Sequence, residues 1–178
     1  VGWSRFAGAV GRAVVAEGRC LVSGGAVGAD LAAADGALAS GDGAPVVEIL
    51  PVGLWLAPVR PSVCQLTVCA PGADFTTGQA MERNALIYAA STHTVVVRPR
   101  FRVGGTWTGA VDALRRRLGT LLVAGPPSDR AVATLVALGG VPLASVADMP
   151  AALMVEAPRP QPSLFGGSAV REPVLAFG

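Results

Sequence analysis

Short apolar runs alternate with longer segments of helical spacing along most of this chain. The apolar runs predict buried strands over 19–22, 46–52, 65–69, 94–97, 121–123 and 141–143. Apolar residues repeat every three to four positions in the intervening segments, which predict helices over 6–17, 31–40, 78–90, 106–117 and 128–138. Strands that alternate with helices predict a mostly parallel sheet covered on both faces. The pattern therefore indicates the α/β class with a three-layer αβα, Rossmann-like architecture.

The two ends of the chain depart from this alternation. Val1–Arg5 reads as the end of a strand whose earlier residues are absent, and from Ala157 onward the chain is rich in Pro, Gly and Ser. Such composition predicts a segment with little structure of its own. We therefore expect one domain over residues 1–150, with its first strand truncated, followed by a Pro- and Gly-rich tail over residues 151–178.

Composition supports a compact globule, because 52% of the 178 residues are apolar and only 15% are charged. No apolar run is long enough to cross a membrane and no secretion leader is present, so we expect a cytoplasmic protein. The three cysteines form no metal-ligand pattern, and two of them fall in predicted strands, where we expect buried thiols. The net charge of +2 is too small to indicate nucleic acid by itself, so the distribution of charge matters more.

The segment Ser23–Asp30 joins a predicted strand to a predicted helix through Gly24, Gly25 and Gly28. A strand, a glycine turn and a helix start place backbone N–H groups and a positive helix terminus at one point, which favours an anion such as phosphate. The alternative is a tight turn without a ligand. Asp30 is suited to a ribose hydroxyl or a base amine, or simply to stabilising the helix N-terminus.

A second segment, Arg98–Thr106, repeats this design with Gly104 and Gly105 before a helix. In an extended segment Arg98, Arg100 and Arg102 would point to one side and form a row facing an anion. Trp107 follows, suited either to stacking on a base or to packing in the core. Since ligands of parallel sheets gather at the carboxyl ends of the strands, we expect both segments, and Arg83 and Asn84 with them, on one rim.

No catalytic set can be assembled from the sequence. His93 is the single histidine and precedes a predicted strand without a recognisable Ser or Asp partner. The hydroxyls of Ser23 and Thr106 are better suited to donating to an anion than to nucleophilic attack. We therefore expect no catalytic residues, no metal and no cofactor.

The ordered motifs resemble those of the DprA/Smf DNA-processing family, within the Rossmann-like folds that also include the LOG phosphoribohydrolases. The resemblance covers residues 1–145 and is carried by Gly2 with Ser4-Arg5, Ser23–Asp30, Arg83-Asn84, Gly104–Trp107 and Gly109-Ala110. It implies a core that binds single-stranded DNA and hands it to a RecA-type recombinase in natural transformation. It also implies a homodimer.

Three positions depart from these families. Val27 and Ala85 stand where DprA proteins usually carry arginine, which removes positive charge from the rim. Gly109 stands where the LOG motif places its catalytic glutamate, and cleavage of an N-glycosidic bond needs such a carboxylate. Only Glu82 is nearby to replace it, and its ordinary role is that of an exposed residue in the first turn of a helix.

The leading hypothesis is a non-catalytic, DprA-like protein that binds single-stranded DNA. One alternative is a sensor for a small nucleotide or nucleotide-sugar, and another is a weak nucleotide hydrolase that uses Glu82. The residues expected to contact nucleic acid or phosphate are Arg5, Ser23, Gly24, Gly25, Gly28, Asp30, Arg83, Asn84, Arg98, Arg100, Arg102, Gly104, Gly105, Thr106 and Trp107.

Overall fold

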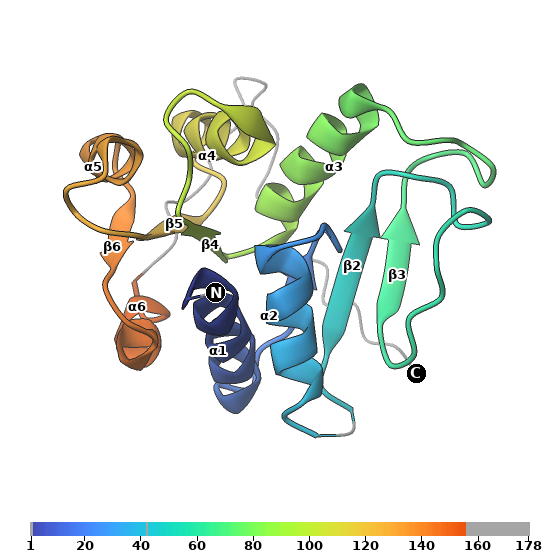
Figure 1. The fold of residues 1–178 in the computed structure, drawn as a ribbon, viewed down its shortest axis with the longest axis horizontal. Coiled ribbons are helices and arrows are strands. Elements are labelled where there is room, and N and C mark those ends of the chain that lie inside the picture. The colour runs from blue at the N-terminus through green and yellow to red at the C-terminus, as the bar shows by residue number, and fades with distance from the viewer. Residues whose placement is uncertain (1, 42, 156–178) are drawn as a thin grey trace, which may run out of the picture.

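A computed structural model describes residues 2–41 and 43–155, in which helices and strands alternate (Figure 1). In chain order the elements are α1 (Gly2–Ala16), β1 (Leu21–Ser23), α2 (Ala29–Leu38), β2 (Val46–Leu50), β3 (Cys64–Thr67), α3 (Thr77–Ala90), β4 (His93–Val97), α4 (Gly104–Arg116), β5 (Thr120–Ala124), α5 (Arg130–Ala137), β6 (Val141–Leu143), a 3-10 turn (Val146–Asp148) and α6 (Met149–Ala152). The α/β class is confirmed, and every strand and helix core predicted after residue 5 is present.

The strands form two parallel sheets of three strands each. One sheet has the order β1-β2-β3 and the other β4-β5-β6, and all four strand pairs are parallel. The expected single sheet is thus hydrogen-bonded as two halves. Parallel pairing throughout brings the carboxyl ends of the strands in each half to one edge, where the loops that precede the helices lie.

The sheet β4-β5-β6 is the centre of a three-layer sandwich. Leu121 and Val123 of β5 pack into one apolar cluster with α3, α4 and α5, whereas Leu122 and Ala124 pack into another with α1 and α6. Successive side chains of a strand point to opposite faces, so the buried run in β5 serves both clusters. In Figure 1 this sheet lies between α4 and α5 above and α1 and α6 below.

The helices α1 and α2 pack unusually closely beside each other, as Figure 1 shows. A Cβ on Gly36 of α2 would collide with the backbone of Gly8 in α1, and a Cβ on Gly11 of α1 would collide with the backbone of Ala33. Glycine at these positions therefore lets the two backbones meet. Ala34 and Ala37 of α2 also pack on Val46 of β2, which ties the pair to the first sheet.

Two local expectations are wrong. The residues expected to end a strand, Gly2–Arg5, form the first turn of α1, because Trp3 and Phe6 fall on one helical face and their rings meet edge to face 5.7 Å apart. Cys20 and Cys64 are exposed and Cys69 is half-buried, so none of the cysteines is a buried core residue. Cys20 lies just before β1 and Cys64 begins the outermost strand of its sheet, where neither thiol is covered.

The packed part of the chain continues past residue 150. Ala152 and Leu153 are buried in the cluster that α1 and α6 share, so α6 belongs to the domain. The remainder of the expected tail, residues 156–178, lies outside the described residues. Within residues 2–41 and 43–155, no helix combines the length and the apolar character that crossing a membrane requires.

Candidate functional site

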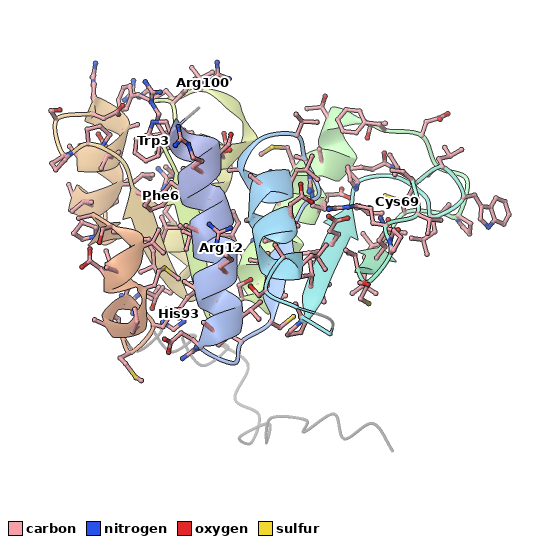
Figure 2. The ribbon with its side chains drawn as sticks, turned by 60° about the horizontal axis from the view of Figure 1, so that its bottom comes forward. Trp3, Phe6, Arg12, Cys69, His93 and Arg100 are labelled. Atoms are coloured by element: carbon pink, nitrogen blue, oxygen red, sulfur yellow. The ribbon has the colours of Figure 1, made fainter. Side chains whose placement is uncertain are left out.

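The loops at the carboxyl ends of the strands gather at one end of the molecule. Arg100, just after β4, and His93, at the start of the same strand, lie at opposite ends of the view in Figure 2. Trp3, in the first turn of α1, lies at the same end as Arg100 in Figure 2. His93 is therefore remote from this edge, and its Nε2 lies 2.9 Å from the backbone oxygen of Val155.

The first glycine loop, Ser23–Gly28, is held mainly by its own hydrogen bonds. The Gly24 N–H donates to Asp30 Oδ2 at 3.1 Å, and the Gly25 N–H donates to Ser23 Oγ at 3.3 Å. Two of the three N–H groups expected to face a ligand therefore have internal acceptors. Gly28, with a φ of 118°, precedes α2 as its N-cap, and no side chain caps that helix. The backbone N–H groups that this loop leaves available to a ligand are thus those at the start of α2.

Arg83 lies directly beneath the first glycine loop and is buried, with only 6% of its surface exposed. Its Nη1 donates to the backbone oxygen of Ile49 at 3.4 Å, while its Nε has no hydrogen-bond partner. A Cβ on Gly24 would collide with this guanidinium, so a larger residue there would require Arg83 to move. Burial lowers the pKa of Arg83, and the nearby Asp30 carboxylate opposes that shift. Arg83 therefore supports the loop from inside.

The adjacent residue Asn84 reaches the second glycine pair. A Cβ on Gly105 would lie 3.0 Å from Asn84 Nδ2 and 3.5 Å from Met81 Sδ. Neighbouring residues of α3 thus contact both loops, Arg83 beneath Gly24 and Asn84 beside Gly105. This confirms that the two motifs share one edge of the fold.

The second glycine loop, Arg98–Gly105, is folded into a turn. The Val103 N–H donates to the Arg100 backbone oxygen at 3.1 Å, and these two residues form an isolated antiparallel bridge. Arg98 and Arg102 adopt left-handed backbone conformations, with φ of 45° and 57°. The expected extended row of three arginines is therefore wrong, because the turn at 100–103 breaks the alternation on which it depended.

Arg98 and Arg100 instead line a cavity of about 570 Å³ that opens beside this turn. It is lined by Arg98, Pro99, Arg100, Phe101, Asp129 and Arg130, and we call it the arginine pocket. The Arg130 guanidinium lies over the Phe101 ring, 4.1 Å from its centroid, and that of Arg102 lies 5.2 Å from the same centroid. Such cation–π contacts hold a guanidinium in place.

Arg130 and Asp129 were not among the residues expected from the sequence. They follow β5, and the parallel pairing of β4 with β5 brings them beside Arg98. The helix predicted over 128–138 is capped by Asp129 and not by Ser128 at its expected start, since Asp129 Oδ1 accepts from the Ala131 N–H at 2.8 Å and the Val132 N–H at 3.4 Å. The rule that ligands gather at the carboxyl ends of parallel strands is the signal that could have identified them.

The remaining expected residues divide into exposed and packed groups. Arg5 is exposed on α1, and Thr106 is exposed in the first turn of α4. Trp107 packs against the apolar cluster of α3, α4 and α5 and meets Phe101 edge to face at 5.0 Å, so core packing accounts for it. Glu82 is exposed on α3.

Gly109 is required by packing between α3 and α4. A Cβ at this position would lie 2.7 Å from Cε2 of the buried Tyr88. A glutamate side chain at residue 109 would therefore displace the tyrosine ring. Among the described residues, no three His, Cys, Asp or Glu side chains are grouped as a metal site requires.

A buried carboxylate supports the first glycine loop from the sheet. Glu48 of β2 is 1% exposed, forms an ion pair with Arg60 and accepts from Gln65 Nε2 at 3.4 Å. Arg60 also pairs with Asp35 of α2 at 2.5 Å. A Cβ on Gly25 would lie 3.2 Å from the Glu48 carboxyl carbon, so this ionic cluster sits against the loop.

The architecture defines a Rossmann-like α/β protein with two glycine loops at the carboxyl edge of its strands. Residues 3–139 match the family model of DNA recombination-mediator protein A, and the chain belongs to that family. None of the curated protein sequences matches this chain.

Two solved structures share the fold. DNA processing protein A of Helicobacter pylori, described for its single-stranded DNA binding mode, superposes with a TM-score of 0.69 at 18% sequence identity, covering 84% of this chain and 73% of that one. DNA processing protein A of Streptococcus pneumoniae superposes with a TM-score of 0.72 at 20% identity, covering 84% of this chain and 56% of that one. This chain thus spans little more than half the length of the pneumococcal protein.

Proposed function

We propose that this protein binds single-stranded DNA in DNA processing and recombination, through phosphate contacts and without catalysis. The observation that carries the proposal is the arginine pocket at the carboxyl edge, which gathers three exposed guanidiniums beside a glycine turn and a helix start. Guanidinium groups suit phosphate oxygens because their planar donors match them in pairs. Membership of the DNA recombination-mediator protein A family supports the same function.

The exposure of each side chain indicates whether it would contact DNA or support a loop from inside. Arg98, Arg100 and Arg130 would contact phosphates, with Arg102 beside them on Phe101. Asn84 and the exposed start of α2 at Gly28 would extend the contacts toward the first loop, while Arg83 would hold that loop in shape. The likeness to the Helicobacter pylori protein supports the single-stranded form of the ligand.

We also propose partners, a cellular role and a location for this protein. Family membership supports delivery of the strand to a RecA-type recombinase, action in natural transformation, and a homodimer. A RecA-type recombinase acts on DNA in the cytoplasm, where we also place this protein. We also propose that the domain, expected over residues 1–150, includes the packed residues of α6.

Binding of an internally labelled 20-base oligonucleotide, measured by fluorescence anisotropy at several salt concentrations, tests the function. Four arginine contacts predict that the logarithm of the affinity falls with the logarithm of salt concentration at a slope of about −3. Neither AMP nor ATP should displace the strand at equimolar concentration. Displacement by a mononucleotide, with no salt-sensitive binding of the strand, would show a small-nucleotide sensor instead.

A further inference from the structure

The arginine pocket concentrates more positive charge than one internal phosphate of a DNA strand needs. Its lining carries Arg98, Arg100 and Arg130 against the single carboxylate of Asp129, which leaves two net positive charges. Arg102 stands beside the lining, with its guanidinium over Phe101. An internal phosphodiester carries one negative charge, whereas a phosphate monoester carries about −1.5 to −2 at pH 7.

The Asp129 carboxylate accepts hydrogen bonds from the protein backbone and does not neutralise all of the positive charge of the pocket. It accepts two backbone N–H groups at the start of α5, where the helix dipole favours a negative charge. The cap also fixes the position of Arg130, the first residue of the same helix. The carboxylate therefore lies at the pocket wall and leaves the pocket with two net positive charges, which match a phosphate dianion.

Arg130 is held in place before any ligand arrives, because its guanidinium lies over the Phe101 ring, 4.1 Å from the ring centroid. Arg98 keeps a left-handed backbone that costs an ordinary side chain free energy, and such strain persists where the surroundings impose it. Fixing flexible side chains in advance lowers the entropy lost on binding.

We propose that the arginine pocket binds the terminal phosphate monoester of a DNA strand, so that the protein recognises a phosphorylated strand end in addition to the strand itself. The inference rests on the proposed function, because the end it recognises belongs to the bound strand. Internal phosphodiesters would then follow the edge toward Gly28 and the start of α2.

Three 20-base oligonucleotides of one sequence, each labelled at an internal base, test the inference. One carries a 5′-phosphate, one a 3′-phosphate and one hydroxyls at both ends, and a 21-base hydroxyl-ended strand controls for added charge. We expect one phosphorylated end to bind at least fivefold more tightly than either hydroxyl-ended strand. Inorganic phosphate in millimolar excess should weaken binding of the phosphorylated strand more than binding of the hydroxyl-ended strands, and so remove that preference.

The double variant Arg100→Gln/Arg130→Gln should lose the preference, whereas Arg115→Gln/Arg116→Gln should keep it. The control arginines lie at the exposed C-terminal end of α4, where Arg116 pairs with Asp112. Equal binding of all four strands by the unmodified protein would overturn the inference while leaving the proposed function in place. A preference that survives in the pocket variant would overturn it too. Absence of binding by every strand would overturn the proposed function and this inference with it.

Discussion

The first glycine loop joins β1 to α2 and the second joins β4 to α4, each through glycines at the carboxyl end of a parallel strand. The first loop is satisfied internally: Gly24 donates to Asp30, and a buried guanidinium and a buried carboxylate lie against it. The second loop carries exposed arginines on a turn that opens beside a cavity. Loops of the same design therefore differ in one respect, which is whether the charges beside them are buried or exposed.

On the function proposed above, the first loop serves stability and the second serves ligand binding. Buried charges are costly to leave unpaired, so the charges under the first loop are hard to change. Exposed arginines contribute little to stability and are free to meet a phosphate. Each of the following changes challenges one side of this contrast, from the largest expected effect to the smallest.

Glu48→Ala should lower the free energy of unfolding by about 3 kcal/mol, because it removes the buried one of the two carboxylates that pair with Arg60. Urea denaturation measures this loss. The matched control is Asp112→Ala, which breaks the exposed pair with Arg116 and should cost about 0.5 kcal/mol or less. Similar losses in both variants would show that burial does not set the first loop apart.

Arg100→Met should weaken binding of a 20-base strand about tenfold, because an exposed charge-assisted contact is lost. Arg83→Met, which removes a charge buried beneath Gly24, should change the affinity of the folded protein by about twofold or less. Anisotropy at low salt compares the two, with circular dichroism to confirm folding. A larger loss for Arg83→Met would place the phosphate contacts at the first loop.

Arg98→Gly should be more stable than Arg98→Ala by about 1 kcal/mol, because Arg98 has a left-handed backbone that glycine adopts without a Cβ clash. Thermal unfolding of the two variants gives this difference. Both should bind the strand equally weakly, since both lack the guanidinium. An alanine variant as stable as the glycine variant would mean that the turn relaxes and that Arg98 is not held in place.

The helix α4, which follows the second loop, packs through Gly109 against the buried Tyr88 of α3. This contact predicts that the free energy of unfolding depends on alkaline pH. Burial raises the pKa of Tyr88, with a smaller contribution from Asp30. An unfolded tyrosine loses its proton near pH 10, so unfolding releases a proton above about pH 10 and the free energy of unfolding falls there by up to about 1.4 kcal/mol per pH unit. Tyr88→Phe should remove that part of the slope, and a slope unchanged by the substitution would contradict it.

The sequence predicted the elements well because buried strands and amphipathic helices leave periodic patterns. Glu48 was visible as the single charge in an otherwise apolar strand, although its partner Arg60 was not, since only the fold brings them together. The same limit hid the burial of Arg83 and the arrival of Arg130 beside Arg98. The extended row of arginines failed for a local reason, because Arg98 and Arg102 adopt positive φ and the chain turns between Arg100 and Val103.

The most direct test of the contrast is the salt dependence of strand binding in the unmodified protein and in Arg98→Gln/Arg100→Gln/Arg130→Gln. If the arginine pocket carries the phosphate contacts, the slope of the logarithm of affinity against the logarithm of salt should change from about −3 to about −1. A slope that is the same in both proteins would contradict the account and return the phosphate contacts to the first glycine loop.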